Sequence, residues 1–400
     1  MTLKTEIDRD FVEELSDERD EPEWLKERRM NARESFGNLP DPNIIKTPGK
    51  RWTDLEALDV FSAASDTEGE STKEISADVP DDVIVEDFST AQDEHDELLN
   101  EKLMNVAVRW DENKYTAVHA AAMRGGTLVY VPEGVEVDGT VDIKHEIGEK
   151  SRFNNTLIIA EEQAKVTVAE RISGGDSSFF SGVVEVLADD ASEVNYGALQ
   201  DLDQESTQFT VKRGVAGRDA EVNWIDGCFG TAVTKSVVST IIEGEGAETT
   251  NYGVFFGTDS QHFDVETWTQ HNAPNTTCDM FTRGVLDDQA VAAYEGTIKV
   301  EEPAFNVDAY QTENVLLVSD EAEADASPQL EIDNHDVRCS HAATMGQVDS
   351  EELFYMKSRG LDEEIARRQI VEGFFEPVFG ELPFDALEDS FREVIQEKMD

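Results

Sequence analysis

The sequence predicts a mainly β protein in which a parallel β-helix, or solenoid, lies between two helical regions. The helical spacing of apolar residues ends at Gly125-Gly126 and gives way to short β-branched runs. A sequence pattern, in which an apolar run is followed by a turn with a small residue, then repeats at nearly equal intervals. Helical spacing resumes only from Ser350. These three observations define the fold class.

Residues 1–126 are expected to form an N-terminal helical region that includes an acidic segment. Apolar spacing predicts helices over residues 10–35 and 91–122, the second interrupted near residues 111–113. Residues 54–101 hold seventeen acidic residues and one basic residue. We therefore expect this segment to be mobile or loosely packed surface.

The β-helix is expected over residues 127–338. The small residue of this sequence repeat is found at Val135, Ala164, Ala191, Ala220, Ala247, Ala290 and Ala322. A small residue suits a corner, because stacked coils lie about 4.8 Å apart. The steps are 27 to 32 residues, except for 43 between Ala247 and Ala290, which predicts an excursion or additional turn within residues 258–277. An antiparallel sandwich also has short strands, but it would not favour such a regular series.

Residues 339–400 are expected to form a C-terminal helical domain. Two helices that meet at Gly360 and a last helix over residues 385–398 are predicted. The apolar face over residues 354–379 is denser than a lone surface helix needs. It is therefore expected to pack on the solenoid, on a partner, or on both.

The charge is extreme, with a formal net value of −55 from 88 acidic against 33 basic residues. Self-repulsion on this scale opposes compaction, and molar salt shortens the Debye length to about 3 Å. The composition therefore predicts a protein of an extreme halophile. The alternative is an acidic disordered or metal-buffering chain, but five Trp and twenty Phe argue against disorder. No basic stripe is present to bind nucleic acid.

The chain is expected to be cytoplasmic. Its three cysteines, Cys228, Cys278 and Cys339, are widely spaced and odd in number, which suits a reducing compartment. The N-terminus is charged and no apolar run reaches about 18 residues, so neither a signal peptide nor a membrane span is predicted.

Signatures of catalysis are missing from the sequence. The G-x-x-x-x-G-K-[ST] loop is absent, so no ATP site is expected. A nucleophile elbow and the H-E-x-x-H zinc motif are absent as well. The chain is therefore not expected to be an enzyme by itself.

The candidate metal ligands are Cys339 and His341. A thiol and an imidazole two residues apart on a strand point to the same face, where both can contact one soft or borderline metal. Spacing alone favours a structural reading, in which Cys339 is a small buried residue and His341 a core or interface histidine. The structural reading is also favoured for Cys228 and for Cys278 with His271. Two ligands do not complete a site.

Several motifs carry a family resemblance over nearly the whole chain. They are Glu21-Pro22-Glu23-Trp24-Leu25, Tyr130-Val131-Pro132-Glu133-Gly134-Val135, Tyr294-Glu295-Gly296-Thr297-Ile298, Asp308-Ala309-Tyr310-Gln311-Thr312, Pro328-Gln329-Leu330-Glu331-Ile332, the stretch from Asp336 to Val348, and Leu353-Phe354-Tyr355-Met356-Lys357-Ser358-Arg359-Gly360. In these motifs the sequence resembles the SufB/SufD family of the SUF iron–sulfur cluster assembly machinery.

Within that family the sequence is similar to the SufD branch. SufB-type chains have a glutamate directly after the histidine that matches His341, where this chain has Ala342. They also have a cysteine in the turn that matches residues 320–322, where this chain has an alanine. Those SufB groups are held to nucleate the cluster, so the resemblance implies that this chain does not assemble one alone.

The resemblance implies a right-handed β-helix that pairs with a SufB-like subunit through its late strands. His341 and Cys339 would face that subunit, with a transient iron–sulfur cluster at the interface. Two SufC-like ATPase subunits would bind the C-terminal helices of the pair, and a homodimer of the isolated chain is left open. The expected partner-binding residues are Phe354, Tyr355, Arg359, Gly360, Ile370, Phe374 and Phe375. Reduced flavin is linked to the assembled complex, although no residue here places it.

Two alternatives come from other classes of protein. One is a β-helix enzyme, such as a polysaccharide lyase or a trimeric hexapeptide-type zinc enzyme. The scarcity of basic residues and the lack of an export signal argue against a lyase. The other is a structural solenoid scaffold that binds no metal.

Overall fold

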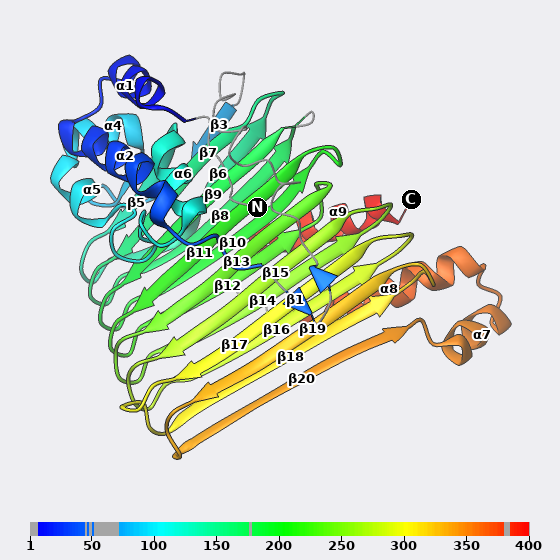
Figure 1. Ribbon diagram of the computed structural model, residues 1–400. Coiled ribbons are helices and arrows are strands. Elements are labelled where there is room, and N and C mark those ends of the chain that lie inside the picture. Colours follow the sequence, from blue (N-terminus) through cyan, green and yellow to red (C-terminus); the bar gives the residue numbers. More distant parts are fainter. Residues whose placement is uncertain are drawn as a thin grey trace.

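The centre of the molecule is a solenoid built from two nine-stranded sheets (Figure 1). From β5 onward, successive strands belong alternately to one sheet and the other, so each coil adds one strand to each sheet. The strands of successive coils pair in parallel. The predicted mainly β solenoid is confirmed. This computed structural model describes residues 7–44, 46–47, 50–51, 72–175, 178–379 and 385–399.

We call the sheet that ends in β20 the even sheet and the sheet that ends in β19 the odd sheet. Across the even sheet the order is β3 (Thr72–Ser76), β6 (Glu136–Ile147), β8 (Lys165–Gly174), β10 (Glu193–Leu202), β12 (Glu221–Cys228), β14 (Glu248–Gly257), β16 (Thr277–Leu286), β18 (Val307–Leu317) and β20 (Val337–Gln347). Across the odd sheet the order is β4 (Ile84–Asp87), β5 (Gly125–Val131), β7 (Arg152–Ala160), β9 (Phe179–Ala188), β11 (Thr207–Ala216), β13 (Val233–Ile242), β15 (His262–His271), β17 (Val291–Val300) and β19 (Glu323–Ile332). A small separate sheet pairs β1 (Lys46–Thr47) with β2 (Lys50–Arg51).

The coils stack in register. Asn195 in β10 lies opposite Asn223 in β12, 28 residues further along, and accepts a hydrogen bond from its side chain at 2.9 Å. The corners stack too, because the backbone N–H of Gln163 donates to the carbonyl of Asp190 in the next coil at 2.9 Å. The corner residue Ala164 is fully buried. The predicted repeat and its small corner residue thus have the expected structural cause.

The predicted excursion within residues 258–277 is wrong. That segment contains β15 and its turns, which continue the regular alternation of the two sheets. Ala247 stands before β14 of the even sheet, whereas Ala290 stands before β17 of the odd sheet. The 43-residue step therefore covers one coil and a half, because the small corner residue passes from one edge of the solenoid to the other.

The N-terminal region is more ordered than its composition predicts. Where 91–122 was expected to form one interrupted helix, three helices lie over residues 88–122. The acidic stretch over residues 72–101 is not loose surface, because β3 pairs with β6 and β4 pairs with β5, both antiparallel. The rest of the expected acidic segment, residues 54–71, lies outside the described residues. The helices of the region are α1 (Arg9–Glu18), α2 (Glu23–Ser35), the 3-10 turn η1 (Phe36–Asn38), α4 (Phe88–Glu94), α5 (Asp96–Lys102) and α6 (Lys114–Ala122).

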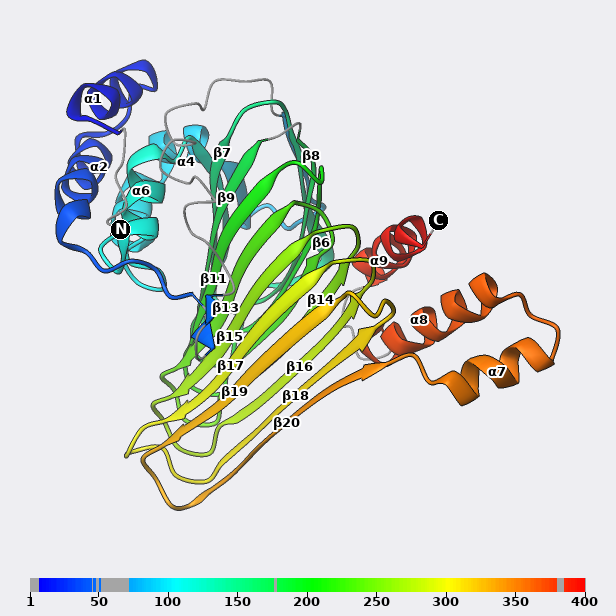
Figure 2. The same cartoon turned by 45° about the vertical axis from the view of Figure 1, so that its right-hand side comes forward.

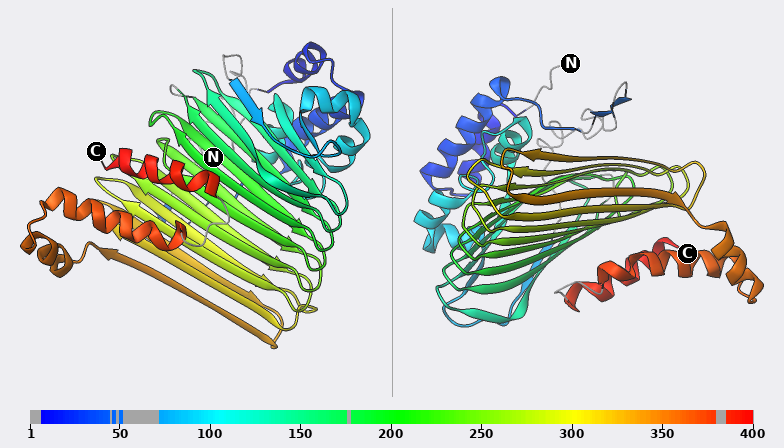
Figure 3. Two further views of the ribbon diagram at one scale, coloured as in Figure 1. Left: turned by 180° about the vertical axis from the view of Figure 1, so that it is seen from behind. Right: turned by 90° about the horizontal axis from the view of Figure 1, so that it is seen from below.

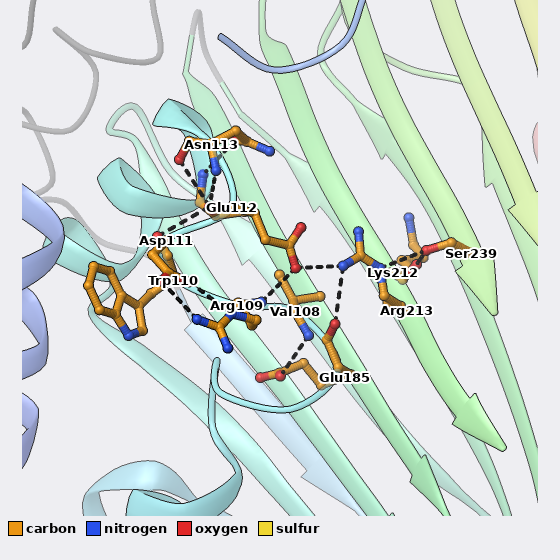
Figure 4. Close-up of polar contacts among 12 residues, drawn as sticks. Val108, Arg109, Trp110, Asp111, Glu112, Asn113, Glu185, Lys212, Arg213 and Ser239 are labelled. Atoms are coloured by element: carbon orange, nitrogen blue, oxygen red, sulfur yellow. Dashed lines mark hydrogen bonds and ion pairs between the residues drawn. The ribbon is translucent and has the colours of Figure 1, made fainter. Parts of the chain in front are cut away.

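Polar contacts tie this region to the outer face of the odd sheet (Figure 4). The buried carboxylate of Glu185 accepts hydrogen bonds from the backbone N–H groups of Met104 at 2.7 Å and Val108 at 3.2 Å. Arg213 pairs with Glu112 at 2.6 Å. Burial raises the pKa of Glu185 to about 8. The loop between α5 and α6 is thus held by side chains of β9 and β11.

The C-terminal helices follow the last strand and lie on the even-sheet side (Figure 3). They are α7 (Ser350–Ser358), α8 (Glu363–Phe379) and α9 (Asp385–Lys398). Gly360 separates α7 from α8 with a φ of +95°, as a glycine at a helix end favours. Because β20 continues to Gln347, the helical part begins at Ser350 rather than at 339. Among the described helices, none combines the length and apolar character needed to cross a membrane.

Candidate functional site

The last coil of the solenoid consists of β19 and β20, and within the described chain no strand pairs with their outer edges. Figure 2 shows β20 along this edge, with α7 directly after it. The residues of β20 are exposed, apart from Val337 and Cys339, which are half-buried. We call this the open end of the solenoid. An edge strand offers a row of backbone donors and acceptors.

Cys339 and His341 point to the same, inner side of β20, as the strand spacing predicts. Cys339 lies opposite Ala309 and His341 lies opposite Gln311, and both of these neighbours are buried. Burial, and then the carboxylate of Asp308, raise the pKa of the Cys339 thiol. His341 is exposed, because it stands in the terminal coil.

The other two cysteines lie inside the solenoid. The Cys278 thiol donates to Thr269 at 3.2 Å, whereas Nδ1 of His271 contacts the hydroxyl of Thr276 at 2.8 Å. Cys278 and His271 therefore have separate partners. Burial raises the pKa of Cys278 to about 12 and that of Cys228 well above its usual value. Both thiols are kept protonated in the core.

Another group of possible metal ligands lies at the opposite end of the molecule. Ligand atoms of Glu86, Glu94 and His95 all lie within 4.8 Å of one another, between β4 and the α4/α5 junction. His95 Nε2 lies 3.8 Å from Glu86 Oε2. All three side chains are partly open to solvent, and exposed acidic groups gather in this way in proteins without binding a metal.

The interior of the even sheet holds a feature that the sequence analysis missed. One inward column of neighbouring positions passes through three carboxylates, and its members in order are Glu170, Ala198, Asp226, Gly253, Thr282, Glu313 and Ala343. The sequence could have indicated this feature, because each acidic residue stands at a strand position where the alternation of the sequence places an inward, apolar side chain. Such a position predicts that the carboxylate is buried, but it does not predict which residue forms its ion pair or hydrogen bond.

The first two carboxylates of this inward column are fully partnered. Glu170 pairs with His145 at 2.7 Å and accepts a hydrogen bond from Tyr196. Burial opposes ionisation of Glu170, but the hydrogen bond and charge of His145 outweigh it and hold its pKa below the usual value. Asp226 pairs with Lys212 at 3.0 Å.

The third carboxylate, Glu313, lies one coil below the open end and differs from the first two. Its side chain is 2% exposed, and its Oε2 atom has no hydrogen-bond partner among the described residues. Burial, and then the charge of Asp325, raise the pKa of Glu313 to about 8. Both polar atoms of the neighbouring inward side chain, Gln311, also lack a partner in the described chain. Unpaired polar atoms therefore collect directly beneath His341.

The expected partner-binding residues fall into two groups. Phe354 is 74% exposed and Tyr355 is 57% exposed on α7, and Arg359 lies over the Tyr355 ring at 5.0 Å. Gly360 is exposed as well. This group, on and just after α7, is available to a partner.

The other group lies on α8 and faces the solenoid. Phe375 is fully buried and contacts the ring of Phe256 in β14, with centroids 6.3 Å apart. Ile370 and Phe374 are half-buried against the same apolar cluster. The guanidinium of Arg283 lies over the Phe374 ring at 4.8 Å and donates to its carbonyl. Phe375 is therefore a core residue, and the expectation that it lies on a partner-binding surface is not met in this structure.

Fold and site together define a class of protein, a β-solenoid whose uncovered last coil carries an imidazole and a thiol. Two family models match the sequence, the "SUF system FeS cluster assembly, SufBD core domain" over residues 143–374 and the "SufBD protein N-terminal region" over residues 59–143. The chain belongs to the SufBD family.

Curated relatives agree with this assignment. The chain is 32% identical to the iron–sulfur cluster assembly protein SufD of Bacillus subtilis, over 100% of both chains. It is 27% identical to SufB of the same organism, over 95% of this chain and 90% of SufB. A SufBD family protein of Staphylococcus saprophyticus is 26% identical over 94% of this chain and 89% of its own.

Proposed function

We propose that this chain is the SufD-like component of an iron–sulfur cluster assembly scaffold. In this proposal it pairs with a SufB-like subunit at the open end of the solenoid and binds a SufC-like ATPase through α7. The observation that carries the proposal is the uncovered last coil, with His341 and Cys339 on its inner side. The chain supplies no ATP site of its own, and we propose that it acts as a scaffold rather than as an enzyme.

The shape of the open end supports pairing with a second solenoid. The edge strands present unpaired backbone groups, and an added strand would satisfy them. Exposed apolar side chains at this end, Met345 at 45% and Ile332 at 36%, favour contact with protein rather than with water. The same edge could accept a second copy of this chain when no SufB-like subunit is present.

The two candidate ligands suit iron as a cargo that is shared with a partner. An imidazole and a thiol both bind iron, but two ligands leave a cluster incomplete. Ala342 follows His341, so the carboxylate that SufB-type chains have at this place is missing. The remaining ligands would come from the partner, and the cluster would form between the two chains. No residue of this chain points to a flavin site.

The C-terminal helices support a mechanical link to the ATPase. Two residues separate the end of β20 from the start of α7, so a force on its exposed Phe354 and Tyr355 acts close to the His341 strand. The buried part of α8 fixes these helices to the even sheet through Phe375 and Arg283. Motion driven by ATP on the partner could thus shift the edge strand against the SufB-like subunit. With a net charge of −55, we propose that this happens in a salt-rich cytoplasm.

The test is anaerobic reconstitution with a SufB-like and a SufC-like protein at high salt. His341→Ala should lower the rate of cluster formation, read from visible absorption, at least tenfold, while the three proteins still co-purify. His335→Ala is the matched control, because His335 is exposed on the turn before β20 and outside the strand. Cluster formation at the normal rate in the His341→Ala complex would refute the proposed role of this residue.

A further inference from the structure

The inward column of the even sheet contains three carboxyl groups, and among the described residues two of them have a basic side chain as a partner. His145 lies against Glu170, and Lys212 lies against Asp226. Glu313 occupies the same column near the open end, and no such partner for its Oε2 atom is present in the described residues. Glu313 is thus the one carboxyl group of this column that has an unpaired oxygen atom among the described residues.

The neighbouring inward side chain, Gln311, also has unpaired polar atoms. Gln311 is 1% exposed, and both its amide oxygen and its amide nitrogen lack partners in the described part of the chain. The Gln311 amide lies against Gly296 of the odd sheet, and a side chain larger than that of glycine at position 296 would collide with this amide. Buried polar groups are almost always paired, and a water or an ion that binds there is one explanation of an unpaired group. Here three unpaired atoms belong to two adjacent inward side chains.

The open end gives these atoms access to a ligand. His341 lies opposite Gln311 and Ala343 lies opposite Glu313, both in the last coil. Strands in register lie about 4.8 Å apart, so His341 and Gln311 occupy adjacent positions on the inner side of the sheet. Only a methyl group covers Glu313 on this side, and Ala343 is itself exposed. A carboxylate, an amide oxygen and an imidazole are ligands that suit divalent first-row metals.

We propose that Glu313, Gln311 and His341 form a binding site for one divalent transition-metal ion at the open end of the solenoid. Glu313 supplies the negative charge, Gln311 a second oxygen, and His341 the nitrogen from the outer coil. The site extends the proposed function, because it names an ion that the isolated chain binds before a partner completes a cluster. It can nevertheless be tested on this chain alone.

The experiment is a titration of the purified full-length chain with Co²⁺, followed by its visible absorption. About 2 M KCl screens the acidic surface, since the Debye length is then below about 3 Å. The wild-type chain should bind about one equivalent tightly. Glu313→Gln, which keeps the shape but removes the charge, should weaken binding at least tenfold. His341→Ala should also weaken it and change the intensity of the absorption bands, because a nitrogen ligand is lost.

The matched control is Glu331→Gln. Glu331 lies on β19 of the same coil, exposed and on the outer face, and this variant should bind Co²⁺ as the wild type does. Thermal unfolding without and with Co²⁺ gives a second measurement, because an ion bound to the folded state raises the midpoint. That rise should occur in wild type and Glu331→Gln but not in Glu313→Gln.

Two results would overturn the proposal: no tight equivalent in the wild type, or equal affinity in the Glu313→Gln variant. The outcome is separable from that of the proposed function. If Glu313→Gln binds metal normally while His341→Ala still blocks cluster formation in the complex, this inference fails and the proposed function stands. If the metal site behaves as expected but no complex forms with the SufB-like and SufC-like proteins, the proposed function fails and the site remains.

Discussion

The two ends of the solenoid differ in how the chain covers their terminal coils. At the first end, β3 and β4 run antiparallel to β6 and β5, and the N-terminal helices pack over the outer face of the odd sheet. At the open end, β19 and β20 have no described neighbour on their outer edges. A parallel solenoid cannot end its own hydrogen-bond ladder, so each end needs a cap. Within the described residues the chain caps only the first end, and the proposed function assigns the second end to a partner.

Particular buried polar groups at the two ends can be compared in the same way. At the first end, both ring nitrogens of His119 are engaged, by Ser181 at 2.7 Å and Asn155 at 2.8 Å. The phenol of Tyr115 donates to the carbonyl of Phe209 at 2.6 Å. Near the open end, Gln311 and Glu313 keep unpaired atoms among the described residues. Asn154 Oδ1 and Asn155 Nδ2 are also unpaired at the first end among the described residues, so what distinguishes Gln311 and Glu313 is that they lie one coil below an uncovered edge.

The largest expected effect comes from breaking the closed end. Arg29 is 1% exposed, and it pairs with the equally buried Glu21 at 2.6 Å and bonds the carbonyls of Ala120 and Ala121. Arg29→Ala leaves the buried Glu21 with only the longer contact to Arg19, at 3.4 Å, and it should lower the free energy of unfolding by about 3 kcal/mol in urea titrations. Arg9→Ala is the control, because Arg9 is 66% exposed in its pair with Glu13, and it should change the free energy of unfolding far less than Arg29→Ala does. Equal losses would contradict the comparison.

A pH dependence of stability is expected from Glu185, which holds the loop before α6. Burial raises its pKa from the ordinary 4.5 to about 8 in the folded chain. Between these values the folded state binds the proton more tightly, so its contribution to the free energy of unfolding falls as the pH rises, by up to about 1.4 kcal/mol per pH unit. The contribution levels off below about 4.5 and above about 8.

Hydrogen exchange of the Met104 and Val108 amides would follow this change directly, because both groups donate to Glu185. Glu185→Gln removes the titrating group and should flatten the dependence of the unfolding free energy on pH. An unchanged pH profile in this variant would assign the effect to another residue.

The smallest effect on stability is expected at the open end. Met345 lies on the uncovered strand β20 and is 45% exposed. Met345→Lys should change the free energy of unfolding of the isolated chain by less than about 0.5 kcal/mol, as surface substitutions usually do. If the edge pairs with a SufB-like subunit, the same change should weaken that association about tenfold in a binding titration. Loss of stability without loss of association would reverse the roles that we give to the two ends.

The sequence alone determined the coil and its period. Each coil of about 28 residues contains its own inward apolar positions and its own small corner residue, so the pattern is local and repeats. The helix break at Gly360 was also predictable, because a glycine at a positive φ acts through its own backbone. The pairing of Cys339 and His341 on one face followed from the two-residue period of a strand.

Only the tertiary structure decided how distant segments meet. No local pattern shows that the acidic stretch before α4 folds into β3 and β4 to cap the first coil. Two phenylalanines on neighbouring helices read alike in the sequence, yet Phe375 is buried on the even sheet and Phe354 is exposed. The inward column likewise gives Asp226 a lysine and leaves Glu313 without one. Such outcomes depend on contacts between residues that belong to different coils or helices, and local periodicity contains no information about those contacts.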